Sequence, residues 1–300
     1  MITILIILLS NVCLQAQDLI FRQFPTAYLY YNPAYAGLVG KHVVHLNSKY
    51  YGIENINQGL RPSISSFLSY DTHFSDSLHS VGILAFYDNE SYVFESQHLG
   101  GIYSFNLIYR ENLRFKIGTE ISYNSKSIDF SRLILPDQID PQNGVVRPTI
   151  ETFHHGDVQY MDTKLGAVFK INNLISTFSV NHILSPNTSL IYSNSTIPMS
   201  FSGTLEYYFL FFPEYFVFKP GFLFNKQDIF YNYNLLLNFS LFKHYKLGLI
   251  ISPSSTFGWM IGIDFLKHWT LFFYSEKSIS DLALANFFSY EGGISYRFSK

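Results

Sequence analysis

The segment from Leu113 to Ser125, LRFKIGTEISYNS, alternates between two kinds of side chain. The first set, on odd positions, is mostly apolar: Leu113, Phe115, Ile117, Thr119, Ile121 and Tyr123. The second set is charged, polar or small: Arg114, Lys116, Gly118, Glu120, Ser122 and Asn124. Because successive side chains of a strand point to opposite faces, this pattern predicts a strand with one apolar and one polar face. The apolar face contacts either the core of a soluble sandwich or membrane lipid.

The same alternation recurs along the chain, for example in MDTKLGAVFKI (161–171) and YNYNLLLNFS (231–240). We expect fourteen strands, at 39–50, 63–73, 80–88, 98–109, 113–124, 161–171, 174–182, 199–210, 215–225, 231–240, 245–251, 257–265, 268–276 and 290–298. Bacterial single-chain membrane barrels have an even number of strands. Most of these segments have close to the ~9–11 residues that cross a bilayer when tilted, whereas soluble strands most often have about 5–6.

The lengths of the connections between these strands depend on whether the connection is odd- or even-numbered along the chain. Every even-numbered connection is short, and the long ones, at 51–62, 89–97, 125–160, 183–198 and 277–289, are all odd-numbered, along with two short ones. Short turns at one end and long loops at the other are typical of membrane barrels. The sequence therefore predicts an all-β protein, a transmembrane antiparallel β-barrel of the bacterial outer membrane. It has about fourteen strands, long extracellular loops and short periplasmic turns.

Composition agrees with a membrane protein. Charged residues are 14% of the chain, against roughly a quarter in soluble domains, and aromatic residues are 18%. A net charge of −2 gives no basic footprint for nucleic acid, so we expect no nucleic-acid partner. The single cysteine, Cys13, excludes a disulfide and a four-thiolate zinc site within one chain.

The N-terminus resembles a targeting segment. Residues 1–16, ending in LQA, predict a signal peptide cleaved after Ala16, although no Lys or Arg precedes the apolar run. A lipoprotein signal at Cys13 is the alternative, which the bulky Val12 fits poorly. We expect residues 17–38 to form a periplasmic N-terminal segment and residues 39–300 to form the barrel.

The chain shows no motif for catalysis. It lacks a Gly-rich phosphate loop, a nucleophile elbow and a paired-histidine zinc helix. His154, His155 and Asp157 are read as an exposed loop rather than a metal site, and Asp137 and Asp140 as turn residues rather than calcium ligands. We therefore predict no enzyme activity, no cofactor and no metal. Several charges fall on the polar faces and predict a wet or mutually paired lumen, or else a selectivity lining: Lys116, Glu120, Lys164, Glu206 and Asp264.

One short motif, NPAYAG at Asn32 to Gly37, is not typical of strands. Asn-Pro begins a turn, and Pro33 fixes its own backbone. Ala34 and Ala36 are small enough for close packing, and Gly37 permits an unusual backbone angle. The motif predicts a tight entry turn, or a plug at the periplasmic mouth, or a site that binds a partner.

This segment resembles the start of the PorP/SprF family of outer-membrane proteins of the type IX secretion system. The matching residues are Gln23, Tyr28, Tyr30, Asn32, Pro33, Ala34, Ala36 and Gly37. Weaker similarities follow at Gly82 and Asp88, at His182 and Pro186, and in the closing strand, where Tyr296 and Phe298 resemble the aromatic C-terminal signal of outer-membrane barrels. The chain departs from the family pattern at Ser275 and Tyr290.

The resemblance implies a non-enzymatic component of type IX secretion, integral to the outer membrane of a Gram-negative bacterium. Such proteins support export or surface anchoring of large adhesin-like cargo, in some bacteria for gliding motility. The implied partners are outer-membrane lipid, other secretion components and the C-terminal domain of a large secreted surface protein. We expect that domain to bind the barrel or its extracellular loops, with 125–160 as the candidate loop. A porin or hydrophobic-solute transporter and an outer-membrane lipid hydrolase are the alternatives.

Overall fold

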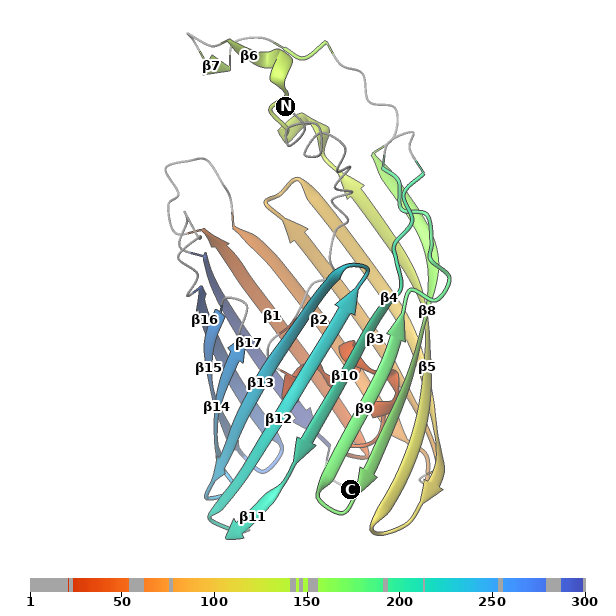
Figure 1. Ribbon diagram of the computed structural model, residues 1–300, viewed down its shortest axis with the longest axis vertical. Coiled ribbons are helices and arrows are strands. Elements are labelled where there is room, and N and C mark those ends of the chain that lie inside the picture. The colour runs from red at the N-terminus through yellow and green to blue at the C-terminus, as the bar shows by residue number, and fades with distance from the viewer. Residues whose placement is uncertain are drawn as a thin grey trace, which may run out of the picture.

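The computed structural model describes residues 21, 24–53, 62–75, 78–140, 144–145, 148–150, 156–190, 194–212, 214–252, 256–278 and 287–298. Most of them belong to one antiparallel sheet that closes into a barrel (Figure 1). Within this part of the chain, no helix is long and apolar enough to cross a membrane.

Fourteen long strands form the barrel wall. They are β1 (His42–Ile53), β2 (Ser63–His73), β3 (His79–Glu90), β4 (Phe94–Tyr109), β5 (Leu113–Ile128), β8 (Asp157–Ile171), β9 (Leu174–Asn181), β10 (Ser200–Tyr207), β12 (Phe216–Gln227), β13 (Phe230–Leu241), β14 (Tyr245–Ser252), β15 (Thr256–Phe265), β16 (Trp269–Ser278) and β17 (Phe287–Arg297). Neighbours in sequence pair with each other, β1 pairs with β17 and β10 pairs with β12, so the ring closes. The predicted fold class is confirmed.

One predicted strand, 199–210, is divided in the structure. β10 ends at Tyr207, and the short β11 (Phe209–Phe212) continues past it and pairs with β12 with a shifted register. The division falls at Tyr208, whose amide donates to the carbonyl of Asn173 in the β8–β9 turn. The run YYFLFF carries no alternation that would reveal this break.

The two faces of the wall differ as the alternation predicts. On β5, Ile121 is 57% exposed on the outside, whereas Lys116 and Glu120 are each 1% exposed on the inside. Exposed Ile, Leu, Phe and Tyr side chains on the outer face are suited to contact with lipid. The apolar core of a bilayer, unlike water, does not penalise exposed apolar groups. The apolar face of Leu113 to Tyr123 thus lies on the outside of the barrel.

The connections differ between the two ends, which we call the short-turn end and the long-loop end. At the short-turn end β4 joins β5 through 110–112, and β8 joins β9 through 172–173. At the long-loop end β5 joins β8 through 129–156, a connection that contains η3 (Phe130–Arg132), η4 (Pro136–Gln138), β6 (Ile139–Asp140) and β7 (Gly144–Val145) (Figure 1). The predicted long connection at 89–97 is wrong, because β3 and β4 extend to leave only Ser91–Val93 between them.

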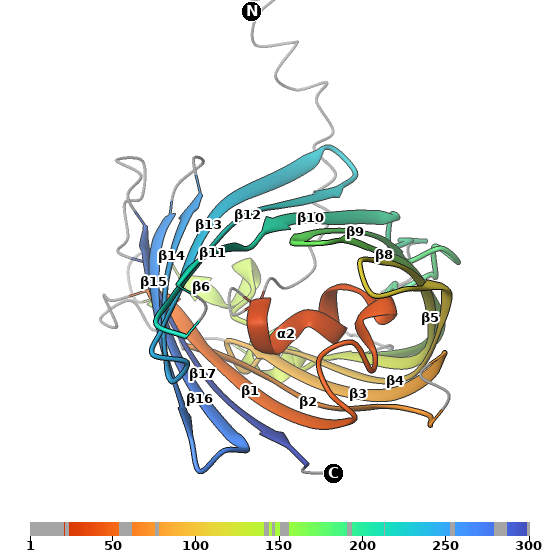
Figure 2. The same ribbon diagram turned by 90° about the horizontal axis from the view of Figure 1, so that it is seen from below.

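A short N-terminal segment lies inside the barrel. It consists of α2 (Phe24–Tyr31), with non-helical angles at Ala27, and the 3-10 turn η1 (Pro33–Tyr35). Figure 2, seen from the short-turn end, shows α2 within the ring of strands. The buried apolar cluster of the molecule joins this segment to inward-facing side chains such as Phe67 and Val168. We call residues 24–38 the lumenal segment. Of the expected periplasmic segment 17–38, the structure describes these residues and Phe21. The division at 16 and the signal peptide lie outside the described residues and stay predictions.

Candidate functional site

The NPAYAG motif folds as a capped turn inside the lumen. Asn32 caps η1, and its side-chain Oδ1 accepts a hydrogen bond from the amide of Ala34 at 2.9 Å. Pro33 occupies the first turn, where its missing N–H leaves no donor unsatisfied. Residues 32–36 are all buried. The motif therefore packs against the inside of the wall.

Two glycines in neighbouring strands make room for this turn. Gly118 on β5 and Gly166 on β8 lie opposite each other in the register. A Cβ added at Gly118 would lie 2.6 Å from the Ala34 amide nitrogen, and one at Gly166 would lie 2.0 Å from Asn32 Oδ1. Any side chain at either position would collide with the motif. The paired glycines thus form a seat for the turn.

Asn32 also binds the wall directly. Its Nδ2 donates to the carbonyl of Ala167 on β8 at 3.1 Å and to that of Phe178 on β9 at 3.0 Å. These two residues oppose each other across the β8–β9 pair. One amide side chain therefore caps the turn and ties it to two strands.

The end of the motif is held by residues of β2, β3 and β5. Gly37 has φ +67°, a region that favours glycine, and its amide donates to Asp71 Oδ2 on β2 at 2.6 Å. Lys116 Nζ donates to the carbonyl of Ala36 and to Ser80 Oγ on β3, the latter at 2.8 Å. A Cβ at Gly37 would lie 2.5 Å from Ser80 Oγ, so space and backbone angle both require glycine.

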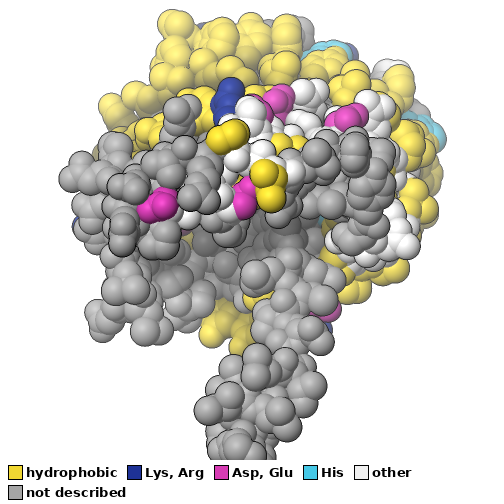
Figure 3. Space-filling model, turned by 90° about the horizontal axis from the view of Figure 1, so that it is seen from above, with side chains coloured by type: hydrophobic (Ala, Val, Ile, Leu, Met, Phe, Trp, Pro, Cys, Tyr) yellow, Lys and Arg dark blue, Asp and Glu magenta, His cyan; other side chains and the backbone are white. Residues whose placement is uncertain are grey.

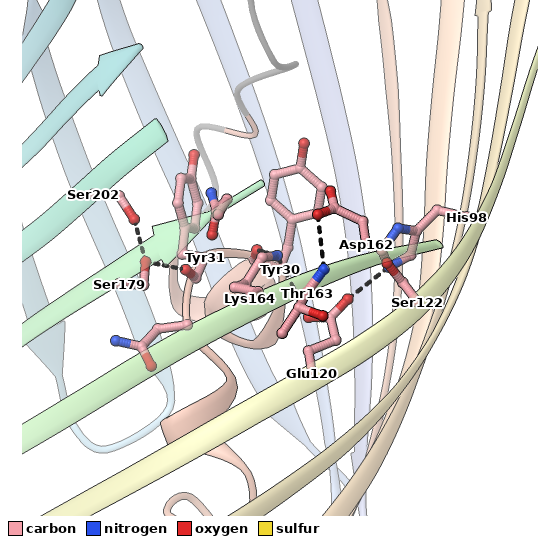
Figure 4. Close-up of polar contacts among 12 residues, drawn as sticks. Tyr30, Tyr31, His98, Glu120, Ser122, Asp162, Thr163, Lys164, Ser179 and Ser202 are labelled. Carbon is pink, nitrogen blue, oxygen red and sulfur yellow. Dashed lines mark hydrogen bonds and ion pairs between the residues drawn. The ribbon is translucent and has the colours of Figure 1, made fainter. Parts of the chain in front are cut away.

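Polar side chains of the wall hold the end of α2 (Figure 4). Lys164 Nζ donates to the carbonyl of Tyr30 at 2.8 Å, and Ser179 Oγ donates to that of Tyr31 at 2.7 Å. The last carbonyls of a helix have no partner within it, and a cation near them is favourable. Tyr28 adds a hydrogen bond from its hydroxyl to Asp71 Oδ1 at 3.0 Å.

Four of the five predicted inward charges form ion pairs. Glu120 lies 3.4 Å from Lys164 Nζ and 2.7 Å from His98 Nε2 (Figure 4). The other two acids of the predicted set also form ion pairs, Glu206 with Lys219 at 3.0 Å and Asp264 with Lys246 at 2.7 Å. Ion pairing inside the lumen therefore accounts for Glu120, Lys164, Glu206 and Asp264. Lys116 instead donates a hydrogen bond to the lumenal segment.

A cavity of about 570 Å³ lies above the lumenal segment, toward the long-loop end. Tyr30 and Tyr31 form part of its floor, and Glu120 and Lys164 part of its wall. Its lining includes the acids Asp88, Glu90, Glu95, Glu120 and Asp162 and the lysines Lys126, Lys164 and Lys226. Figure 3, viewed from this end, shows several acidic side chains among the described atoms. The cavity has a mixed polar and aromatic lining.

The C-terminal aromatic residues lie together on the last strand and just beyond it. The rings of Tyr296 and Phe298 are 4.7 Å apart, and Tyr296 also packs against Trp269 at 4.6 Å. The amide of Phe298 donates to the carbonyl of His42 at the start of β1, at 3.0 Å. Their role as a barrel signal stays a prediction.

Only some of the candidate metal-binding loop residues fall within the described residues. His154 and His155 lie outside the described residues, and Asp157 begins β8. Asp137 Oδ2 accepts hydrogen bonds from the amide of Ile150 at 2.8 Å and from Thr149 Oγ1 at 2.9 Å. The amide of Ile150 is the main reason that the pKa of Asp137 is lowered. Across the described ranges no group of three or more His, Cys, Asp or Glu could hold a metal ion.

The structure brings together all the predicted motif residues, Asn32, Pro33, Ala34, Ala36 and Gly37, in one turn that is buried from Asn32 to Ala36. Sequence reasoning missed the wall residues that hold the lumenal segment, namely Gly118, Gly166, Ser179, Asp71 and the hydrogen-bonding roles of Lys116 and Lys164. The alternation of β5 already placed Gly118 between Lys116 and Glu120 on the inner face. A glycine at an inward position is a sign of close backbone approach.

Comparison with known proteins decides the family. The family model described as type IX secretion system membrane protein PorP/SprF matches residues 14–296. The chain belongs to the PorP/SprF family. This PorP/SprF protein is therefore an integral outer-membrane component of the type IX secretion system, and membership implies association with other components of that system. A comparison with curated proteins finds no match.

Solved outer-membrane barrels share the fold at low sequence identity. The CymD monoaromatic hydrocarbon channel has a TM-score of 0.58 at 12% identity, covering 92% of this chain and 93% of that one. A Pseudomonas aeruginosa FadL homologue has a TM-score of 0.55 at 10% identity, covering 91% and 94%. The Pseudomonas putida toluene transporter TodX has a TM-score of 0.53 at 12% identity, covering 92% and 94%. These similarities show that the PorP/SprF protein shares the fold of these barrels.

Proposed function

We propose that this PorP/SprF protein supports export or surface anchoring of a large adhesin-like protein. It does so by binding the cargo, through the C-terminal domain of that cargo, or by binding partner secretion proteins. The observation that carries the proposal is the lumenal segment. The NPAYAG motif occupies the lumen and is tied to β2, β5, β8 and β9. A lumen occupied in this way is poorly suited to solute flow and leaves the two barrel ends for protein contacts.

The cargo contact proposed here is the long connection 129–156. It is the longest connection of the barrel, and its described part contains short elements of its own. Hydrogen bonds from Thr149 and Ile150 to Asp137 hold together residues twelve and thirteen positions apart. Such local order favours a surface that a protein partner could recognise. Trimming this loop should release cargo from the cell surface, and cargo that survives on the surface would contradict the loop assignment.

Affinity purification tests the proposed function. The tagged protein is extracted from native outer membranes in mild detergent, and the proteins that copurify are identified by mass spectrometry. An unrelated outer-membrane barrel with the same tag is the control. Recovery of type IX components together with a very large surface protein is the expected result. Recovery of the barrel alone, under conditions that preserve known envelope complexes, would contradict the proposal.

Transport of a hydrophobic solute is the second candidate. The shared fold with the CymD hydrocarbon channel and the cavity of about 570 Å³ above the lumenal segment favour it. Uptake of a labelled aromatic hydrocarbon into vesicles that contain the purified protein distinguishes the two. Saturable uptake above that of empty vesicles would favour transport.

A further inference from the structure

A second cavity lies at the short-turn end of the lumen, below the lumenal segment. Its volume is about 210 Å³, well above the roughly 15 Å³ that holds one water. It is lined by residues 37–40, where the chain leaves the motif for β1, and by His73, Asn106, Tyr109, Arg114 and Lys116. Val39 and Tyr109 are both exposed at its rim, so the cavity is open to solvent at this end.

The lining of this cavity is cationic. Arg114 and Lys116 lie two residues apart on β5 and both face it, and none of the described residues that line it is acidic. Lys170 on β8 lies opposite Arg114 in the register and adds a third cation beside it. Within the described part of the chain, none of these three side chains forms an ion pair. Cations without counter-charges inside a barrel mouth attract an anion.

Arg114 has the geometry of an anion ligand. Its Nε is buried without a hydrogen-bond partner, and its guanidinium lies 4.7 Å from the ring centre of Tyr109, which fixes its plane. A buried donor without a partner is costly, and an oxyanion would satisfy it. Lys116 uses two of its three donors on Ala36 and Ser80 and retains one.

Asp71, a buried acid bonded to the lining residue Gly37, is already engaged with the lumenal segment. Asp71 Oδ1 accepts from the Tyr28 hydroxyl at 3.0 Å, and Oδ2 accepts from the Gly37 amide at 2.6 Å. Both oxygens therefore face the lumenal segment. Asp71 is absent from the cavity lining, so it does not complete the coordination of Arg114.

We propose that this cavity binds a phosphate group, with Arg114 as the principal ligand and Lys116 as a second. The planar guanidinium matches two phosphate oxygens, which a single ammonium group cannot do. The phosphate belongs either to the headgroup of a membrane phospholipid or to a free phosphorylated compound at the short-turn side. This inference is independent of the proposed secretion function.

Titration with inorganic phosphate tests the site. The full-length protein in dodecyl maltoside, which contains no phosphate, is followed by 31P NMR line broadening. We expect saturable binding that is at least tenfold weaker in Arg114→Gln, because a charged hydrogen-bonding pair is lost. Arg110→Gln, which removes the same charge from the exposed β4–β5 turn, is the matched control and should bind as the wild type does.

A second variant keeps the test valid if Arg114→Gln misfolds. Val39→Glu places a carboxylate at the exposed rim without removing any ligand, and it should weaken phosphate binding by repulsion.

Repeating the titration in phospholipid nanodiscs separates the two sources of the phosphate group. Lost binding of inorganic phosphate identifies the lipid headgroup as the occupant, and retained binding identifies a free phosphate compound. Non-saturable binding in detergent, or equal binding by wild type, Arg114→Gln and Val39→Glu, would overturn the proposal.

Discussion

Gly118 and Gly166 determine where the N-terminal motif packs. A Cβ on either one would overlap Asn32 or Ala34, as judged by separations of 2.0 to 2.6 Å. At Gly118 a rotamer change cannot relieve the contact, because the added Cβ would approach the backbone nitrogen of Ala34. The position of the motif therefore depends on the absence of two side chains in a distant part of the chain.

Gly118→Val is expected to expel the lumenal segment while the barrel still folds. The aromatic residues of the segment, Tyr28 to Tyr35, then become accessible to chymotrypsin, and cleavage between residues 24 and 38 is read by mass spectrometry. Gly101→Val on β4 is the matched control, since an added Cβ there has no atom within 4 Å. Equal resistance of both variants to cleavage would show that the glycine seat does not hold the motif.

Asn32→Ala should loosen the same segment without a steric clash. The substitution removes the helix cap and two hydrogen bonds to strand carbonyls, and leaves those carbonyls with fewer partners. We expect the free energy of local opening to fall by about 2 kcal/mol, or roughly thirtyfold faster amide exchange in residues 24–38. Hydrogen exchange with mass spectrometry measures this, with the exposed Asn112→Ala as control. Unchanged exchange would mean that Asn32 does not hold the segment.

At the scale of elements, the lengths of strands were harder to predict than their number. β4, β5 and β8 each extend four residues beyond the expected edge at the long-loop end, to Phe94, Ile128 and Asp157. The outward side chains there are polar, such as Gln97, Ser125 and Gln159, so apolar alternation ends before the backbone ladder does. The apolar alternation in the sequence therefore marks only the part of a strand that faces lipid, whereas the backbone hydrogen bonds of the strand continue beyond that part.

The ion pair between β5 and β8 gives a test at this scale. Glu120 is 1% exposed and opposes Lys164 directly in the register. Lys164→Met leaves that carboxylate buried with only His98, so we expect a loss of about 3–5 kcal/mol in the free energy of unfolding. The double variant Glu120→Met and Lys164→Met should recover most of it. Urea unfolding of the protein in lipid vesicles measures each variant; additive effects would indicate that the pair is not coupled.

At the scale of the whole molecule, the barrel could be predicted from the sequence and the position of its N-terminal segment could not. Strand alternation and loop parity identify a closed sheet with an apolar outer face. The motif identifies a turn, but its seat lies more than eighty residues away, on strands that meet only when the barrel forms. Because no local pattern links Asn32 to Gly166, the lumenal position needed the three-dimensional structure.

The direct test of the central claim, that the lumenal segment occupies the barrel, is conductance in planar bilayers. The full-length protein is compared with a variant that lacks residues 24–38, both purified as folded barrels. We predict low conductance for the full-length protein and a several-fold larger, stable conductance for the deletion variant, because the segment no longer fills the lumen. Equal conductance of the two proteins would show that the segment does not fill the lumen.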